Sequence, residues 1–244
     1  MVDPRTGLPF LLLSQNKLSF GWPAGSCRLS FFGGKCKRGE SPEQAAGREA
    51  IEESIGAVAF HCDDSTRDKH WQRCKRVARS LLEGEFVGKY DFGSRVVFVV
   101  NIPWDPGCVR RFRNNHSLLS AVSKCCKQQG ERRDKMRDNE FRLSRSERMT
   151  LFPLSRESRS ARHRWLVSSS ALSYRRDGCG TPQIRGVRSQ YLEKQRLILL
   201  SVAHIQAACD SGDRHVTADG VVHLNRTLTT EAMRSGYQLL DQHG

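Results

Sequence analysis

The apolar and polar positions in the first part of the chain predict short buried strands. Leu8–Leu13 is a continuous apolar run that follows a glycine and ends at a polar stretch, which is typical of a buried strand. A valine-rich run over Arg95–Ile102 predicts a second strand, because β-branched residues favour the extended conformation. Ala57–Phe60 is a shorter candidate. These runs predict that the fold contains a sheet.

Other segments have the apolar spacing of helices. Asp68–Leu82 is predicted to be a helix with an apolar stripe, formed by Trp71, Cys74, Val77, Ala78 and Leu81. Arg110–Arg148 has little apolar content beyond 118–122, and we expect a helix and a mobile loop over the core. Ser189–Ala208 is predicted to be a helix that closes the fold or forms an interface. The mixture predicts an α/β protein.

One helix is indicated by its start as well as by its composition. Ser41 suits the N-cap position, Pro42 suits the first helical position, and Glu43 places negative charge in the first turn. Within Glu43–Ile55 only Gly47 disfavours a helix. We therefore predict a helix over this range.

Three glutamates share one face of this predicted helix. At about 100° per residue, Glu49, Glu52 and Glu53 fall within roughly one third of the circumference. These carboxylates repel one another unless a cation neutralises them, and Mg²⁺ or Mn²⁺ prefers oxygen ligands. Arg48 lies one turn before Glu52 and is within reach of Glu40. The alternative interpretation is a solvated face with ordinary ion pairs, which leaves the fixed spacing of the whole set unexplained.

The segment 34–56 resembles the signature box of the Nudix hydrolases. That box is a Gly, five residues, a Glu, seven residues, then Arg-Glu, an apolar residue, any residue and Glu-Glu, and this chain has every fixed residue of it. The fixed residues are Gly34, Glu40, Arg48, Glu49, Glu52 and Glu53. The glycine that follows the box comes one residue late, as Gly56. The resemblance implies an α/β/α sandwich that hydrolyses a nucleoside diphosphate linked to another group.

The resemblance also implies a role for each residue of the box. Glu52 and Glu53 would be the main ligands of Mg²⁺ or Mn²⁺. Glu49 would be a further ligand or the group that activates water, and Arg48 and Glu40 would be an orienting pair. Metal ions suit this chemistry, because they can activate water and stabilise negative charge on a diphosphate.

Two other segments supply candidate site residues. Gly33 and Gly34 permit backbone conformations that a loop close to a phosphate requires. Many Nudix enzymes use another carboxylate from a late loop, and segment 139–154 resembles that loop. Glu147 is our candidate and Glu140 is the alternative, while the other interpretation of either residue is an ordinary ion pair with the surrounding arginines.

The resemblance divides the chain into two parts. A Nudix hydrolase domain would occupy 1–175, interrupted by a basic insertion at about 106–139. A C-terminal extension would occupy 176–244 and contain a helix at about 189–208. A chain of 244 residues is long enough for one domain with such additions.

Positive charge is concentrated in one region of the chain. The formal net charge is +14, and the region 110–188 holds 20 Lys and Arg against 7 Asp and Glu. Such a region is typical of proteins that bind a polyanion, because Lys and Arg neutralise backbone phosphates. A solvated, arginine-biased insertion is the alternative explanation. Together with the Nudix box, the charge favours RNA 5′ ends, and capped mRNA in particular, as substrate.

Two other functions are compatible with the same residues. The first is a Nudix hydrolase of small nucleotides such as dNTPs, dinucleoside polyphosphates or nucleotide sugars. The second is an RNA-binding protein with a Nudix fold and no turnover. The complete set of glutamates argues against the second, because an inactive site has no need for a repulsive carboxylate cluster.

Composition suggests a reduced, intracellular environment. The 9 cysteines have no regular spacing, and no secretory apolar segment is evident. No apolar stretch reaches the length of about 20 residues that spans a bilayer, so we expect no membrane partner. The cytoplasm is the expected compartment, with mitochondria as the alternative. The sequence does not indicate an oligomeric state.

Overall fold

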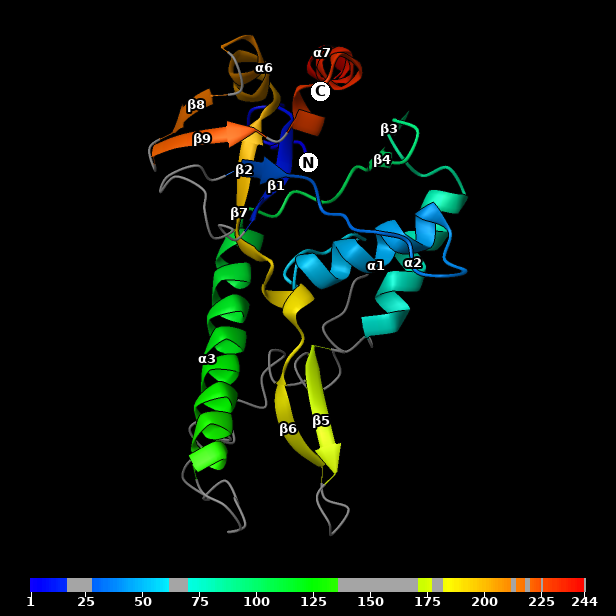
Figure 1. Cartoon of the computed structure of the whole chain (residues 1–244). Helices are drawn as coiled ribbons and strands as arrows, with labels where there is room; N and C mark the ends of the chain where they lie inside the picture. Colours follow the sequence, from blue (N-terminus) through cyan, green and yellow to red (C-terminus); the bar gives the residue numbers. More distant parts are fainter. Residues whose placement is uncertain are drawn as a thin grey trace.

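The structure is a computed structural model that describes most of the chain. The described residues are 1–16, 28–61, 70–135, 171–176, 182–211, 214–217, 220–224 and 226–243. They form a mixed α/β arrangement in which helices surround small sheets (Figure 1). This agrees with the expected α/β class.

A five-stranded sheet forms the centre of the molecule. Its order is β7-β1-β2-β9-β8, and only the β2–β9 pair is parallel. The strands are β1 (Phe10–Asn16), β2 (Arg28–Ser30), β7 (Lys194–Ser201), β8 (Arg214–Thr217) and β9 (Gly220–Leu224). The longest pairing joins β1 to β7, in a register that opposes Leu12 to Leu199. Segments from both ends of the chain therefore share one sheet.

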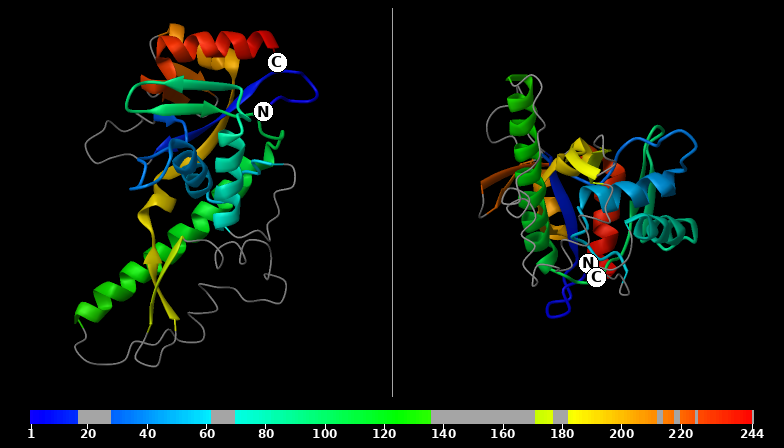
Figure 2. Two further views of the ribbon diagram at one scale, coloured as in Figure 1. Left: turned by 90° about the vertical axis from the view of Figure 1, so that its right-hand side faces the viewer. Right: turned by 90° about the horizontal axis from the view of Figure 1, so that it is seen from below.

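Two hairpins and several helices complete the described fold. The hairpins are β3 (Gly88–Asp91) with β4 (Val96–Val99), and β5 (Leu172–Arg176) with β6 (Pro182–Val187). The α-helices are α1 (Pro42–Glu53), α2 (His70–Leu82), α3 (Gly107–Lys135), α6 (Val202–Asp210) and α7 (Glu231–His243). Short 3₁₀ helices lie at η2 (Ser189–Leu192) and η3 (Arg226–Thr229). The far part of α3 and the β5–β6 hairpin extend away from the sheet on the same side (Figures 1 and 2).

The central strands place side chains into two apolar clusters. Leu197 of β7 and Leu12 of β1 belong to a cluster with α1, α2 and α3. Leu200 of β7 and Leu13 of β1 belong to a second cluster with α6 and α7. Successive side chains of a strand point to opposite faces, so this alternation means that both faces of the sheet are covered.

The helix predicted over Ser189–Ala208 is wrong. This segment contains η2, the strand β7 and only then the helix α6. An apolar run that is buried on both faces of a sheet lacks the alternation of an exposed strand, so periodicity alone does not separate it from a helix. The boundary drawn at 175/176 is also crossed by the five-stranded sheet, because β7 pairs with β1 and β9 pairs with β2.

The strand predicted over Ala57–Phe60 is also wrong, because this segment pairs with no strand in the part of the chain that the structure describes. Its carbonyl groups accept hydrogen bonds from side chains instead. The Ala57 carbonyl accepts from Arg111 Nη2 at 2.8 Å, and the Val58 carbonyl accepts from Arg73 Nη2 at 2.6 Å. Side chains of α2 and α3 thus supply the partners that a neighbouring strand would otherwise provide.

The other strands and helices predicted on described residues are confirmed with changed limits. β1 and β4 lie within or close to the two predicted strands, and α2 matches the predicted helix from His70 onward. In the predicted stripe of α2, Trp71 is 51% exposed, whereas Val77, Ala78 and Leu81 are buried. α3 is a structural part of the core, since Phe112, Leu119 and Val122 on it are buried. The predicted loop beyond Lys135 lies outside the described residues.

Close packing of α1 on α2 depends on Gly47. A Cβ atom at this position would lie 2.6 Å from the Cys74 carbonyl oxygen and 2.9 Å from the Ala78 nitrogen, both backbone atoms of α2. We expect Gly47→Ala to lower the free energy of unfolding by about 2 kcal/mol, because overpacking must move a helix. Urea denaturation measures this change.

Gly186→Ala is the matched control for that substitution. Among the described residues, its Cβ would meet only the Ser173 hydroxyl oxygen, at 3.9 Å. We expect a change within about 0.5 kcal/mol, as is usual away from packed sites. A Gly47→Ala protein as stable as the wild type would show that the two helices are not held in close contact at this point.

Candidate functional site

The glutamate face of α1 begins at a well-defined helix start. The Ser41 hydroxyl accepts a hydrogen bond from the Gln44 N–H at 3.2 Å, and Gln44 Oε1 accepts one from the Ser41 N–H at 2.9 Å. This reciprocal pair is a capping box, and Pro42 follows it at the first helical position. The predicted helix start is confirmed.

The end of α1 explains why the glycine after the box comes late. The helix ends at Glu53, and the chain then passes through Ile55 at φ 46° and Gly56 at φ 67°. A left-handed conformation is unfavourable for a β-branched residue, but Ile55 is fully buried in the cluster with α2 and α3. Asn115 of α3 donates to the Ile55 carbonyl at 3.0 Å. Packing therefore stabilises Ile55 in a left-handed conformation at the position where the Nudix box pattern has glycine.

Arg48 contacts three of the four glutamates of the box, and Glu53 is the fourth. Its Nε and Nη2 atoms donate to the two oxygens of Glu40 at 2.8 and 2.9 Å, which is a bidentate ion pair. Its Nη1 atom donates to Glu49 at 2.6 Å and to Glu52 at 3.2 Å. Nη2 also donates to the Lys35 carbonyl at 3.1 Å. The loop that contains Gly33, Gly34 and Lys35, called the glycine loop below, is thereby connected to the glutamate face. Arg48 and Glu40 pair as predicted.

Glu40 is held in its charged form by this pairing. Hydrogen bonds from Arg48 lower the pKa of Glu40 from 4.5 to about 2, and the Lys37 N–H adds a bond of 2.8 Å in the same direction. Because the folded-state pKa is lower than the unfolded one, the pairing stabilises the fold above about pH 4.5. That stabilisation is lost as the pH falls toward 2.

We therefore expect Glu40→Gln to destabilise the protein in a pH-dependent way. At pH 7 the loss is about 1 kcal/mol, because only the charge of Glu40 is removed and glutamine can still accept a hydrogen bond from Arg48. Urea denaturation at a series of pH values should show the wild-type and variant stabilities converging below pH 4.5. A difference that stays constant from pH 7 to pH 3 would contradict the role assigned to this ion pair.

Glu53 is the most deeply buried member of the face. Its side chain is 2% exposed, one oxygen accepts from the Gly33 N–H at 2.8 Å, and the other lies 3.1 Å from Lys194 Nζ. Burial raises the pKa of Glu53 to about 7, while Lys194 and the Gly33 N–H act in the opposite direction. The carboxylate is thus fixed by contacts to the glycine loop and to β7.

Gly34 allows the loop to approach the helix closely. A Cβ atom here would lie 2.5 Å from Cδ of Glu49 and 3.0 Å from its Oε2. Any larger residue would displace this carboxylate. Gly33 contributes its N–H to Glu53, so both glycines lie against the glutamate face. Neither adopts the left-handed backbone conformation that glycine favours.

The structure brings most of the predicted site together. Glu40, Glu49 and Glu52 meet at Arg48, and Glu53 meets Gly33. Glu147 and Glu140, the two late-loop candidates, lie outside the described residues. Within the part of the chain that the structure describes, no three His, Cys, Asp or Glu side chains converge as a group that could hold a metal ion.

Sequence reasoning missed Lys194. It is the first residue of β7, and its side chain is 7% exposed beside Glu53. The sequence contains one signal for it, a lysine three residues before the apolar run that begins at Leu197, but the segment was expected to be a helix. A buried lysine needs a partner, so the strand assignment would have directed attention to it.

The chemistry of the donor set fits a hard divalent cation. Four carboxylates lie around Arg48 and Lys194, so two negative charges remain when all six groups are ionised. Among the described residues, Glu49 Oε2 and Glu52 Oε1 receive no hydrogen bond. Oxygen ligands with net negative charge suit Mg²⁺ or Mn²⁺. Glu49 and Glu52 are the residues that could hold the ion most readily, because both oxygens of Glu53 already have partners.

A separate pocket lies between α2 and the residues that flank the β3–β4 hairpin. It has a volume of about 310 Å³, and its lining includes Phe60, Val77, Leu81, Phe86 and Val100. None of its lining residues belongs to the glutamate face. The glutamate face, with its charge and close backbone contacts, is therefore the better candidate for chemistry.

Comparison of the chain with protein-family models, curated proteins and solved structures gives no match. Function must therefore be inferred from the residues of this site and from their geometry. None of the described helices is long and apolar enough to cross a membrane.

Proposed function

We propose that this protein is a metal-dependent pyrophosphohydrolase of the Nudix type. The observation that carries this proposal is the face of α1, where Arg48 joins Glu40, Glu49 and Glu52 beside a glycine loop. The glycine loop, the Arg48–Glu40 ion pair and the glutamate face of α1 lie together, which is the arrangement that the resemblance to the Nudix box implies. The proposal includes an α/β/α sandwich of that family, which the helices on both faces of the sheet support.

Each residue of the face has a chemical task in this proposal. When bound, Mg²⁺ or Mn²⁺ supplies Lewis-acid stabilisation of the diphosphate and a more acidic water. Glu52 and Glu53 provide oxygen ligands, and Glu49 holds a ligand position or accepts the proton of the attacking water. Arg48 holds Glu49 and Glu52 in place through bonds of 2.6 and 3.2 Å. The glycine loop lets the diphosphate approach the backbone closely.

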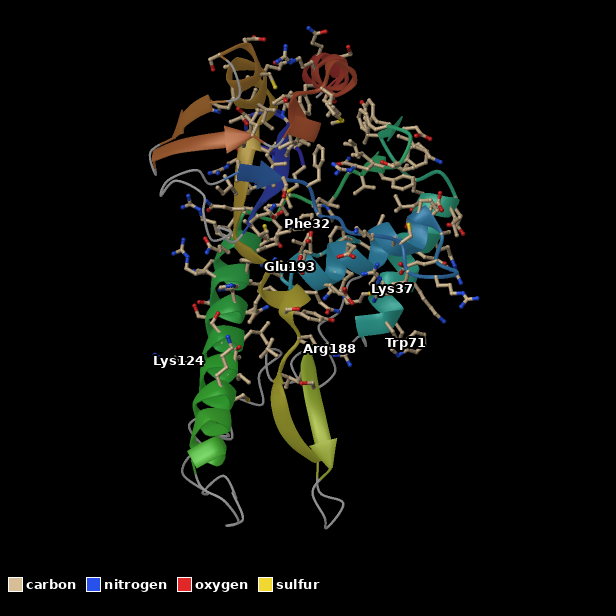
Figure 3. All side chains as sticks on the ribbon, viewed as in Figure 1. Phe32, Lys37, Trp71, Lys124, Arg188 and Glu193 are labelled. Atoms are coloured by element: carbon tan, nitrogen blue, oxygen red, sulfur yellow. The ribbon has the colours of Figure 1, made fainter. Side chains whose placement is uncertain are left out.

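RNA 5′ ends, and capped mRNA among them, are the substrate we favour. The α-helix α3 carries 8 Lys and Arg against 2 Asp and Glu. Arg110, Arg113, Lys124 and Lys127 on it are exposed, while its other face packs in the core. Lys124 lies on the outer side of the helix, and Arg188 lies after β6 on the side of α1 (Figure 3). Basic groups along an extended helix suit a phosphate backbone.

Small nucleotides are the alternative substrate, since the glutamate face needs only a diphosphate. A catalytically silent RNA-binding protein is the third interpretation. A panel of substrates separates these functions: dNTPs, dinucleoside polyphosphates, nucleotide sugars, and triphosphorylated and capped RNA, each with Mn²⁺ or with EDTA. Metal-dependent product release from any of these compounds supports the proposed hydrolase activity. A preference for RNA at low salt supports RNA 5′ ends as the substrate. Silence on the whole panel would favour the binding protein.

We expect the exposed basic residues of α3 to affect the KM for RNA substrates and not the reaction of small nucleotides. A variant with Arg110, Arg113, Lys124 and Lys127 all changed to Gln should raise the KM for capped RNA by about 10- to 100-fold, because phosphate contacts are lost. The rate on a free dinucleotide should stay within about twofold. Steady-state assays with both substrates measure the two effects.

The control variant carries Lys75→Gln and Arg79→Gln on α2, which removes exposed positive charge elsewhere. It should leave the KM for RNA within about threefold, because surface charges act weakly at a distance in salt. Equal losses on RNA and on the dinucleotide in the α3 variant would contradict the role of α3 as an RNA-binding surface.

A further inference from the structure

Lys194 lies at the junction of three strands and the glutamate helix. Its ammonium is 2.6 Å from Asn16 Oδ1 at the end of β1, 3.3 Å from the Ser30 hydroxyl oxygen of β2 and 3.1 Å from Glu53 of α1. The Ser30 hydroxyl also donates to Asn16 Oδ1 at 3.2 Å. An ammonium has three protons, so these three acceptors satisfy it. Lys194 is therefore held in one place by the sheet.

The charge of Lys194 changes what the glutamate face can bind. A divalent ion needs ionised oxygens that are not already paired with a cation. The oxygens of Glu53 are occupied by Lys194 and by the Gly33 N–H, at 3.1 and 2.8 Å. This explains why the three glutamates of the face do not converge in the described structure. Glu49 and Glu52 form ion pairs with Arg48, whereas Glu53 forms an ion pair with Lys194 of the sheet.

We propose that Lys194 is a positioning residue that acts as a built-in cation for Glu53 and thereby weakens the binding of a divalent ion at that residue. The substrate-free protein then uses Glu49 and Glu52 as its first ligands. This inference depends on the proposed function, because it concerns the metal ion of that site. It assigns to β7, which has no residue in the Nudix box, a direct influence on the affinity of the site.

The test measures Mn²⁺ binding without substrate, by the electron paramagnetic resonance signal of free Mn²⁺. Lys194→Gln should bind Mn²⁺ at least tenfold more tightly than the wild type, because one positive charge next to Glu53 is removed. Lys194→Arg keeps the charge and should stay within threefold of the wild type. The double variant Lys194→Gln with Glu53→Gln should lose the gain, because the oxygen ligand that was released is then absent.

A second variant covers the case in which Lys194→Gln does not fold. Asn16→Ala removes one acceptor of the ammonium and leaves its charge, so Lys194 is held less firmly near Glu53. It should tighten Mn²⁺ binding about threefold. Circular dichroism reports whether each variant is folded.

The outcomes separate this inference from the proposed function. Equal Mn²⁺ affinity in the wild type and in Lys194→Gln, or a gain that persists without the Glu53 carboxylate, would overturn the role of Lys194. If Lys194→Gln does not fold, unchanged affinity in Asn16→Ala would do the same. Absence of hydrolysis on all substrates, with the expected order of Mn²⁺ affinities, would contradict the proposed function alone.

Discussion

Glu53→Gln is expected to reduce pyrophosphohydrolase activity about 1,000-fold, which corresponds to a loss of about 4 kcal/mol of transition-state stabilisation. The substitution removes a charged oxygen that would contact the metal ion. The amide oxygen of glutamine can still accept the hydrogen bond that the Gly33 N–H donates at 2.8 Å. The amide leaves the buried Lys194 ammonium without a charged partner, so circular dichroism is used to show that the variant is folded. Phosphate or nucleotide release under saturating Mn²⁺ measures the change.

Glu43→Gln is the matched control. Glu43 is in the first turn of the same helix but points away from the site, 3.8 Å from Lys89 on β3. We expect its activity to stay within about twofold of the wild type, because the ion pair of Glu43 with Lys89 does not involve the glutamates of the site. Comparable activity in Glu53→Gln and Glu43→Gln would show that the metal site has been placed on the wrong residues.

Arg48→Ala is expected to lower the free energy of unfolding by about 3 kcal/mol when no divalent metal is present, because breaking a largely buried ion pair leaves charges uncompensated. The guanidinium contacts Glu40, Glu49 and Glu52, and its side chain is 14% exposed. Removing it leaves three carboxylates that repel one another. Urea denaturation in the presence of EDTA measures this effect.

The same variant should respond more strongly to metal than the wild type. Mn²⁺ binds the folded state only, so it stabilises by an amount that grows with its affinity for the carboxylates. Arg48→Lys restores a positive charge without the bidentate geometry and should recover part of the stability. A loss of stability in Arg48→Ala that is the same with EDTA and with millimolar Mn²⁺ would indicate that these glutamates do not face a common cation site.

The local structure of the site was predictable because its signals lie close together in the sequence. Ser41, Pro42 and the helical spacing of the glutamates are sufficient to place α1 and its charged face, and the structure confirms them. The pairing of Arg48 with Glu40 was predictable for the same reason, since the two residues are eight positions apart at a helix start.

The remaining part of the site depends on contacts between distant segments. Lys194 reaches Asn16 from 178 residues away, and this contact exists only because β7 pairs with β1. A helix over the same residues would have placed the lysine elsewhere. Similarly, the Ala57–Phe60 segment has strand-like composition, but Arg73 and Arg111 satisfy its carbonyls. Sequence patterns describe local preference, whereas pairing partners from other elements decided these two cases.

The measurement that tests the central claim most directly is the release of product from cap-labelled RNA in the presence of Mn²⁺, with the wild type and Glu53→Gln assayed in parallel. We predict that the wild type releases m⁷GDP, that EDTA stops the reaction, and that Glu53→Gln releases about 1,000-fold less. Equal release by both proteins would contradict the assignment of catalysis to the glutamate face of α1. Absence of release from capped RNA and from every small nucleotide would contradict the proposal of a pyrophosphohydrolase.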